Sequence, residues 1–273
     1  MKNPYGPIQA KIVNIEELSP INKLFTLQIK DNQIRNTFKF KHGQFFILSV
    51  PGFGEAPFGF CSSPTIKETF QVSVDKRGSL TSKLFELKKG CEVGIRGPYG
   101  NGFDQKKIKN KNLILVAGGC GLSPLRTIIQ DANLHPEKFK NIQIFYGCRN
   151  PELLAFKKDY NKWNKNIEIN LTVDTADETW KNNVGVVTDL LTSEKIKKDC
   201  VAILVGPPVM YKFVIQKLVE LGLSDEDIYV SLERRMHCGI GICQHCALVN
   251  GNYVCTDGPL FSYAEIKDTP EGI

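Results

Sequence analysis

Four cysteines near the C-terminus are the side chains of this sequence with the clearest chemistry. Of nine cysteines, five are dispersed and four follow the spacing Cys238-x4-Cys243-x2-Cys246-x8-Cys255. This spacing is typical of plant-type [2Fe–2S] sites, in which a short loop wraps the cluster and a later cysteine closes it. Gly239 and Gly241 stand between the first two cysteines, where a glycine lets backbone amides approach the cluster sulfurs. The segment therefore predicts an iron–sulfur cluster.

A structural zinc site is the alternative, because four thiolates also suit tetrahedral Zn²⁺. His237 and His245 flank the cysteines and would be available as substitute ligands. Zinc sites usually combine two short cysteine knuckles that are well separated in sequence, and this segment lacks that arrangement. The spacing thus favours iron and sulfur, and we expect the two histidines to be polar surface side chains.

Two glycine-containing turns are the second chemical feature. The segment AGGCGLSP at 117–124 joins an apolar strand pattern to a helical one, with Ser123 expected as N-cap and Pro124 as the first helical residue. Glycines at such a junction let the backbone approach a pyrophosphate, whose charge the helix N-terminus stabilises. A second turn, VGPP at 205–208, ends another strand pattern. Ligands bind at the carboxyl ends of strands in open α/β sheets, so the pair of turns favours a nucleotide site. A ligand-free turn is the alternative, since 117–124 departs from the GxGxxG fingerprint.

Two domains must position these residues. Alternating runs predict antiparallel strands of a barrel or sandwich over residues 11–18, 23–30, 45–50, 69–76 and 92–97. Five further strands alternate with helical stretches at 125–133, 151–163, 187–196 and 208–222, which predicts a doubly wound parallel sheet. The expected fold class is an N-terminal antiparallel β-barrel at 1–104, a five-stranded α/β domain at 105–232 and a small cluster-binding segment at 233–273.

Composition excludes several other classes. The apolar share of 42% and the charged share of 23% are those of an ordinary globular protein. The net charge of +6 is spread along the chain, so we expect solvated Lys-rich loops and no nucleic-acid partner. No apolar run approaches the ~18 residues of a membrane span, and the N-terminus lacks a signal-peptide pattern. Together with the cysteine usage this predicts a cytoplasmic protein.

Taken as a set, the motifs resemble those of the ferredoxin–NADP⁺ reductase superfamily over essentially the whole chain. The most specific stretches are EAPF at 55–58, RGPYGNGF at 96–103, VGPPVM at 205–210, YVSLERRMHCGIGIC at 229–243 and VCTDGP at 254–259. They are most similar to the branch that carries a C-terminal [2Fe–2S] domain. Within it, the gamma subunits of sulfhydrogenases and the electron-transfer subunit of anaerobic sulfite reductase match better than the dihydroorotate dehydrogenase electron-transfer subunit.

The resemblance implies an oxidoreductase subunit that passes electrons between NAD(P)H, FAD, a [2Fe–2S] cluster and a partner redox subunit, in either direction and without an acid–base catalyst. Residues implied to lie along the flavin are Pro57, Phe58, Gly59 and Phe60. Those implied at the FAD pyrophosphate are Gly78, Leu80, Thr81 and Ser82. Those implied around the nicotinamide nucleotide are Gly119, Gly121, Pro124, Gly206 and Pro207, with Arg149 towards the adenosine end. The implied cluster ligands are Cys238, Cys243, Cys246 and Cys255.

Three departures from the family pattern stand out. The flavin motif R-x-[YF]-[ST] reads Ala56-Pro57-Phe58-Gly59 here, so both its Arg and its hydroxyl are missing. We hypothesise that Arg77 or Arg96 supplies the charge and Ser62 the hydroxyl. Val205 replaces the Cys of the family's CGPP motif, and Cys120 in the facing turn is expected to be a small buried residue.

Two other functions stay open at this point. A dihydroorotate-type subunit has the same chemistry and a different partner. A zinc-stabilised nucleotide-binding regulator has no redox activity. Arg234 and Arg235 beside the cluster segment are equally compatible with a docking patch and with surface charge pairing to Glu233. The choice between NADH and NADPH is not set by these motifs.

Overall fold

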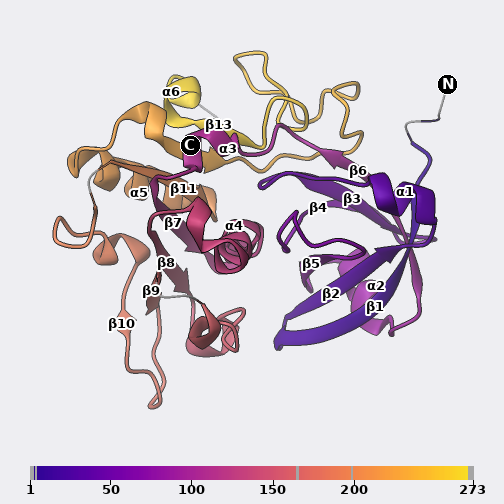
Figure 1. Ribbon diagram of the computed structural model, residues 1–273, viewed down its shortest axis with the longest axis horizontal. Coiled ribbons are helices and arrows are strands. Elements are labelled where there is room, and N and C mark those ends of the chain that lie inside the picture. Colours follow the sequence, from indigo (N-terminus) through magenta and orange to yellow (C-terminus); the bar gives the residue numbers. More distant parts are fainter. Residues whose placement is uncertain (1–2, 4, 164–165, 198, 270–273) are drawn as a thin grey trace.

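The computed structural model describes residues 3, 5–163, 166–197 and 199–269. The outermost residues of the first and third predicted domains fall outside this range. Figure 1 shows two sheets side by side, with the C-terminal residues in yellow running over both. This arrangement confirms the predicted order of a β domain followed by an α/β domain.

The N-terminal domain is a six-stranded antiparallel sheet in the order β4-β3-β6-β1-β2-β5, curved into a barrel. Alternation sets its core: in β5, Phe70, Val72 and Val74 are buried and the residues between them are not. The segment of β4 was not predicted as a strand, because it has no alternation and contains Pro57. The elements are β1 (Ile8–Ser19), β2 (Asn22–Ile29), α1 (Asn32–Thr37), β3 (Phe45–Val50), β4 (Gly54–Gly59), β5 (Phe70–Asp75), α2 (Ser79–Glu86) and β6 (Glu92–Tyr99).

The second domain is built on a seven-stranded sheet in the order β10-β9-β8-β7-β11-β12-β13. Its five predicted parallel strands are β7 (Asn112–Gly118), β8 (Ile142–Cys148), β9 (Ile167–Val173), β11 (Cys200–Val205) and β12 (Ile228–Ser231). Two short edge strands add to them, β10 (Asn183–Val184) and the antiparallel β13 (Leu260–Ser262). The strand order reverses direction at β7 and β11, which is where doubly wound sheets bind ligands.

Helices α4 (Leu122–Leu134) and α5 (Pro208–Glu220) cover opposite faces of this sheet. Leu113 and Leu115 of β7 pack in the same apolar cluster as α4. Ile114 and Val116 pack in the cluster that contains α5. Two short helices, α3 (Gln105–Ile108) and α6 (Tyr263–Ile266), lie beside the sheet.

Two predicted helices are wrong. Residues 151–163 form only 3-10 turns at Pro151–Leu153 and Tyr160–Lys162. Phe156 between them has φ +60°, a value that interrupts a right-handed helix. Residues 187–196 likewise form one 3-10 turn, Val187–Leu190. Further 3-10 turns are Gly119–Gly121, Pro136–Lys138 and Asp225–Asp227.

The start of α4 also differs from the prediction. Gly121 is the N-cap, and Ser123 lies inside the first turn. The preceding 3-10 turn at Gly119–Gly121 runs directly into the helix, so the helix begins before the serine. Pro124 is tolerated because it stands in the first turn, where no amide partner is lost.

The C-terminal segment is an excursion between two strands of the α/β sheet. It leaves β12, passes over the barrel and returns as β13, which pairs with β12 from Tyr229–Ser262 to Ser231–Leu260. None of the helices in the described ranges is long and apolar enough to cross a membrane.

Candidate redox site

The four clustered cysteines occupy the loop between β12 and β13. Cys238, Cys246 and Cys255 are buried and Cys243 is half-buried. The amides of Ile240 and Cys243 donate to Cys238 Sγ at 3.4 and 3.5 Å, and the amide of Gly241 donates to Cys255 Sγ at 3.3 Å. Gly239 and Gly241 have φ of +78° and +76°, a conformation that favours glycine. Sulfurs surrounded by backbone amides are the environment that a negatively charged iron–sulfur cluster requires.

The thiols of this loop are electrostatically unequal. Hydrogen bonds from the backbone of His245 and of Cys238 lower the pKa of the Cys243 thiol to about 7. Burial, and then a hydrogen bond with Cys246, raise the pKa of Cys255 to about 12. The hydrogen bond shows that the Cys246 and Cys255 side chains are neighbours.

The two flanking histidines lie on the surface, as predicted. Both are exposed, and their rings meet edge to face with centroids 4.8 Å apart.

The two glycine turns meet at the carboxyl ends of β7 and β11. A Cβ at Gly121 would overlap the carbonyl of Val205, and one at Gly118 would lie 2.8 Å from Pro207 Cδ. Only residues without a side chain allow this approach. The predicted nucleotide residues Gly119, Gly121, Gly206 and Pro207 are thus brought together at the switch point of the sheet.

Tyrosine hydroxyls hold each turn in place. Tyr146 of β8 donates to the carbonyl of Gly119 at 3.0 Å. Tyr211 of α5 accepts from the amide of Gly206 at 3.1 Å and donates to the carbonyl of Ser231 at 2.6 Å. Sequence patterns did not predict these roles, because both tyrosines are buried and occur in apolar stretches that indicate only core.

The first of these turns has room and a donor for a nucleotide. A Cβ at Gly119 would meet nothing within 4 Å, so the space over this turn is open. The buried Ser123 hydroxyl in the first turn of α4 has no hydrogen-bond partner among the described residues. An open glycine turn and an unused hydroxyl at a helix N-terminus fit the binding of a phosphate group.

Cys120 lies at the surface of this turn, which corrects the expectation that it is buried. Desolvation by the surrounding protein, followed by the charges of Asp75 and Glu233, raises the pKa of its thiol to about 11. Glu233 is also exposed, and desolvation raises its pKa. The charge of Asp75 acts on this thiol from β5, so the turn lies near the barrel domain.

The flavin-motif segment touches the nucleotide turn. A Cβ at Gly59 would lie 3.1 Å from Pro124 Cγ, so the glycine that replaces the family's hydroxyl residue lets β4 pack against the start of α4. Pro57 and Phe58 on β4 are half-buried. Gly59 is therefore placed where the barrel meets the α/β domain, at the end of the strand that carries Pro57 and Phe58.

The start of α2 is the second part of the predicted flavin site. The hydroxyl of Thr81 accepts from the amides of Arg77 and Gly78 at 2.8 and 2.9 Å, and the amide of Ser82 donates to the carbonyl of Gly78. A Cβ at Gly78 would meet nothing within 4 Å. The side chain of Thr81 is thus used to cap the helix, and the open space above Gly78 fits a pyrophosphate. Leu80 points into the core, with 8% of its surface exposed.

Two predicted flavin contacts are core residues in the structure. Phe60 is fully buried and stacks on Phe40 with ring centroids 3.9 Å apart. Ser62 is 1% exposed and accepts a hydrogen bond from the amide of Gln71 at 3.0 Å. Neither side chain is exposed, because the aromatic core of the barrel extends past the end of β4.

The two arginines proposed to replace the flavin-motif arginine differ in their surroundings. Arg77 is exposed beside α2 and pairs with Asp75 at 3.1 Å. Arg96 is buried, and its Nε and Nη2 donate to the Glu55 carboxylate. Its remaining N–H groups donate to the Tyr99 hydroxyl and to the carbonyls of His237 and Cys238. A guanidinium has five N–H donors, so this arrangement leaves none for a phosphate.

Arg149 follows β8 at the same edge of the sheet as the glycine turns, and it is exposed. Its carbonyl accepts from the amide of Thr175, which fixes the backbone there. Arg235 is exposed and Arg234 is half-buried beside the cluster loop.

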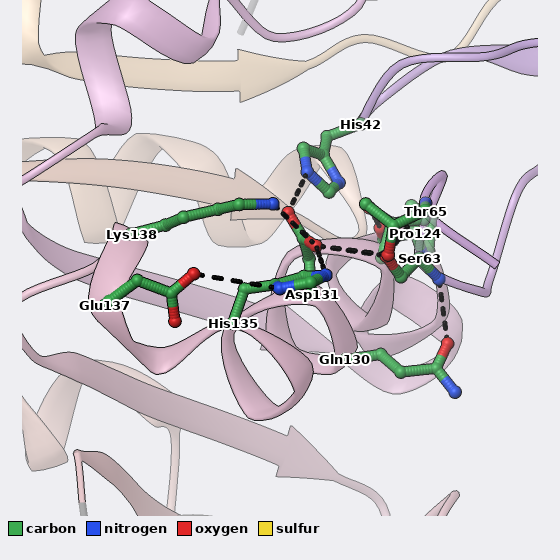
Figure 2. Close-up of polar contacts among 10 residues, drawn as sticks. His42, Ser63, Thr65, Pro124, Gln130, Asp131, His135, Glu137 and Lys138 are labelled. Atoms are coloured by element: carbon green, nitrogen blue, oxygen red, sulfur yellow. Dashed lines mark hydrogen bonds and ion pairs between the residues drawn. The ribbon is translucent and has the colours of Figure 1, made fainter.

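A buried carboxylate that sequence analysis missed joins the two domains. Figure 2 shows Asp131 of α4 at the centre of a polar cluster that reaches from the barrel to the turn after α4. His42 Nε2 donates to one oxygen at 3.2 Å, and the Ser63 hydroxyl donates to the other at 3.2 Å. Lys138 lies 3.5 Å from the same carboxylate. The sequence signal that could have predicted this role is the position of Asp131, a charged residue on the apolar face of the helical stretch 125–133.

Comparison with known proteins places this geometry in a family. Residues 115–216 match the model of the oxidoreductase NAD-binding domain, and residues 233–267 match the iron–sulfur cluster binding domain of dihydroorotate dehydrogenase B. The sulfhydrogenase 2 gamma subunit of Pyrococcus furiosus is 40% identical over 98% of both chains. The probable electron-transfer subunit of dihydroorotate dehydrogenase B from the same organism is 35% identical, covering 95% of this chain and 93% of its own.

Solved structures share the fold. A structure of an NADH-dependent reduced ferredoxin–NADP oxidoreductase superposes with a TM-score of 0.76 at 24% identity, covering 97% of this chain and 91% of that one. The ferredoxin NADP⁺ reductase of Neisseria gonorrhoeae, with bound FAD and NADP, gives 0.68 at 17% identity and covers 81% and 96%.

The matches favour an electron-transfer protein over a zinc-stabilised regulator, and they agree with the amide-rich cysteine loop and the paired glycine turns. The matched domains are those that bind NAD and an iron–sulfur cluster. The chain belongs to the family of NAD(P)H-linked flavin and iron–sulfur electron-transfer subunits that includes the sulfhydrogenase gamma subunits and the electron-transfer subunits of dihydroorotate dehydrogenase B.

Proposed function

We propose that this chain exchanges electrons with a hydrogenase or sulfur-reducing partner, as the reductase subunit of a larger complex. The observation that carries the proposal is the 40% identity to the sulfhydrogenase 2 gamma subunit over 98% of both chains. The sulfhydrogenase 1 gamma subunit also aligns over 98% of this chain at 36% identity. The partner in this proposal includes sulfite reductase, because the sequence motifs resemble its electron-transfer subunit as well as the sulfhydrogenase gamma subunits.

The residues have distinct roles in this proposal. Cys238, Cys243, Cys246 and Cys255 ligate the cluster, because they line one amide-rich loop. Pro57, Phe58 and Gly59 lie along the flavin, and the turn from Arg77 to Ser82 holds its pyrophosphate. Gly119, Gly121, Ser123 and Pro124 bind the nicotinamide nucleotide opposite Gly206 and Pro207, with Arg149 towards its adenosine end.

When bound, the flavin and the cluster would supply the redox chemistry, namely hydride exchange with NAD(P)H and single-electron transfer towards the partner. The protein itself binds, orients and excludes water. The close contact between Gly59 and Pro124 supports this role, because it brings the flavin segment and the nucleotide turn to one place.

An anaerobic visible spectrum of the purified chain tests the electron path. We expect flavin and iron–sulfur absorption that bleaches on titration with NADH or NADPH, and the nucleotide that bleaches at lower concentration is the donor. Cys246→Ala should keep flavin bleaching and lose the cluster signal. Cys200→Ala, a buried cysteine in β11, should keep both signals. A colourless chain that holds zinc after reconstitution with iron and FAD would contradict the proposal.

Dihydroorotate dehydrogenase is the second candidate partner, favoured by the match of residues 233–267 to that enzyme's cluster domain. The native complex, purified through a tag on this chain, separates the candidates. We expect hydrogen-dependent reduction of NAD⁺ or NADP⁺, or reduction of sulfur or sulfite by NAD(P)H. Dihydroorotate-dependent NAD⁺ reduction would identify the second candidate instead.

A further inference from the structure

A buried arginine links the flavin domain to the cluster loop. Arg96 lies on β6 opposite Ile47 of β3, and 4% of its surface is exposed. A buried guanidinium without partners is strongly destabilising, so its partners show what it is placed to hold. They come from two parts of the chain that are far apart in sequence.

The first partner is Glu55 of β4, which neutralises the charge. Its carboxylate accepts from Arg96 Nη2 at 2.6 Å and from Nε at 3.3 Å, a two-pronged pair of the kind that fixes a guanidinium in one orientation. Glu55 is two residues from Pro57, so the strand that carries the predicted flavin contacts also anchors this arginine.

The second set of partners belongs to the cluster loop. Arg96 Nη1 donates to the carbonyl of Cys238 at 3.0 Å, and Nη2 donates to the carbonyl of His237 at 3.0 Å. Tyr99 adds packing to the same loop, since a Cβ at Gly239 would lie 2.6 Å from its ring. The peptide of the first predicted cluster ligand is therefore bound by a charge that the flavin domain holds.

We propose that Arg96, with Glu55 as its counter-ion, is a positioning residue that fixes the cluster loop against the flavin domain. It sets the orientation of the Cys238 ligand and the electrostatic environment of the cluster, and it takes no part in binding the FAD phosphates. The inference rests on the proposed function, because it takes Cys238 as a cluster ligand. Residues that orient metal ligands from outside typically change metal affinity or activity 10–100-fold when they are replaced.

The test uses the full-length holoprotein and the conservative variant Arg96→Lys. A lysine keeps the charge and loses the fork that reaches Glu55 and both carbonyls at once. We expect unchanged FAD affinity and an unchanged rate of flavin reduction by NAD(P)H. We expect an altered EPR spectrum of the reduced cluster, at least about tenfold faster loss of iron to a chelator, and slower electron transfer from flavin to cluster.

Arg126→Lys is the matched control. Arg126 is a second buried arginine in a domain contact, and it donates to the carbonyl of Cys61 at 2.9 Å and to Asp159 at 2.9 Å. It touches no part of the cluster loop in these hydrogen bonds, so its variant should leave the EPR spectrum and iron retention unchanged. Glu55→Gln keeps Arg96 and removes its counter-ion, so it should change the EPR spectrum and iron retention to a smaller degree. This variant keeps the inference testable if Arg96→Lys fails to fold.

Two results would overturn the inference. Arg96→Lys with wild-type EPR spectrum and wild-type iron retention would show that the arginine does not position the cluster. A selective loss of FAD affinity with an intact cluster would assign it to the flavin phosphate. If the wild-type protein itself held no reducible cluster, the proposed function would fail along with the inference. A reducible wild-type cluster with an unchanged variant would remove the inference alone.

Discussion

At the scale of single residues, buried charges show how the two domains are joined. Asp131 is 2% exposed, and its carboxylate is shared by His42 and Ser63 of the barrel and Lys138 after α4. Burial alone would raise its pKa, but the hydrogen bond and charge of His42, followed by Lys138 and Ser63, outweigh burial and lower it. The carboxylate is therefore held in its charged form, and it stabilises the folded state through bonds that cross between domains.

Asp131→Asn is expected to lower the free energy of unfolding by about 1.5–3 kcal/mol at pH 7, because it removes charged hydrogen bonds from a buried site. A lowered pKa stabilises the fold above the unfolded-state value and ceases to do so as pH falls through the folded-state value. The gap in unfolding free energy between wild type and variant should thus narrow as the pH falls below the ordinary value of 3.8.

Urea unfolding at several pH values measures this gap. Asp199→Asn is the control, since Asp199 pairs with Lys111 at an exposed site where an ion pair contributes little. A gap that stayed the same down to pH 3 would show that the charge of Asp131 is not what stabilises the interface.

At the scale of elements, the turn after β7 combines two glycines with different tasks. Gly121 passes against the carbonyl of Val205, whereas Gly119 has open space around it and φ of +56°. Gly121 is required because the two turns pack closely, and Gly119 because a ligand needs room there. Substitutions at the two positions should therefore affect stability and nucleotide binding separately.

Gly121→Ala should destabilise the fold by about 1–3 kcal/mol, because its methyl group overlaps backbone that cannot move away freely. Gly119→Ala should cost only about 1 kcal/mol for its left-handed backbone. It should nevertheless weaken NAD(P)H binding strongly, because its methyl group would occupy the space proposed for the pyrophosphate. Urea midpoints and nucleotide titrations of both variants check this split. Tight binding by Gly119→Ala would place the pyrophosphate elsewhere.

At the scale of the whole molecule, the cluster loop connects the domains with very little regular structure. In the described part of the loop, the only β pairing is one isolated antiparallel bridge, between Ala247 and Tyr253. Arg96 and Asn101 tie it to the barrel, and the Asn101 side chain donates to the carbonyls of Asp257 and Leu260 at 2.6 and 2.8 Å. We expect a segment of this kind to depend on a bound metal centre for its order.

Removal of the cluster with a chelator should therefore raise hydrogen exchange across residues 237–256. Exchange in β7 and β11 should stay unchanged, because these strands are buried in the centre of their sheet. Reconstitution with iron and sulfide should restore protection. Exchange that rose equally in both sheets would show that the cluster stabilises the whole fold rather than its own loop.

Much of this protein follows from local sequence. The spacing of Cys238, Cys243, Cys246 and Cys255 predicts the cluster loop, because ligand spacing in a short loop is a local property. The alternation in β5 and the apolar run of β11 predict the strands, since burial on one face or two sets their composition. The order of strands and helices then predicts the two-domain plan, and segments without a clear period, such as 151–163, were assigned wrongly.

Tertiary structure decided which polar groups are free to bind. Arg96, Ser62 and Phe60 carry the right chemistry for a flavin site, yet burial against distant segments gives each of them another partner. The polar cluster around Asp131 and the tyrosines that hydrogen-bond to the glycine turns likewise depend on contacts between residues far apart in the chain. The sequence alone predicted the cluster from its cysteine spacing and the fold class from its periodicity, whereas FAD was implied by the resemblance of the motifs to a known family. The partners of each buried donor came from the fold, because hydrogen bonds inside a protein are shared between elements that only folding brings together.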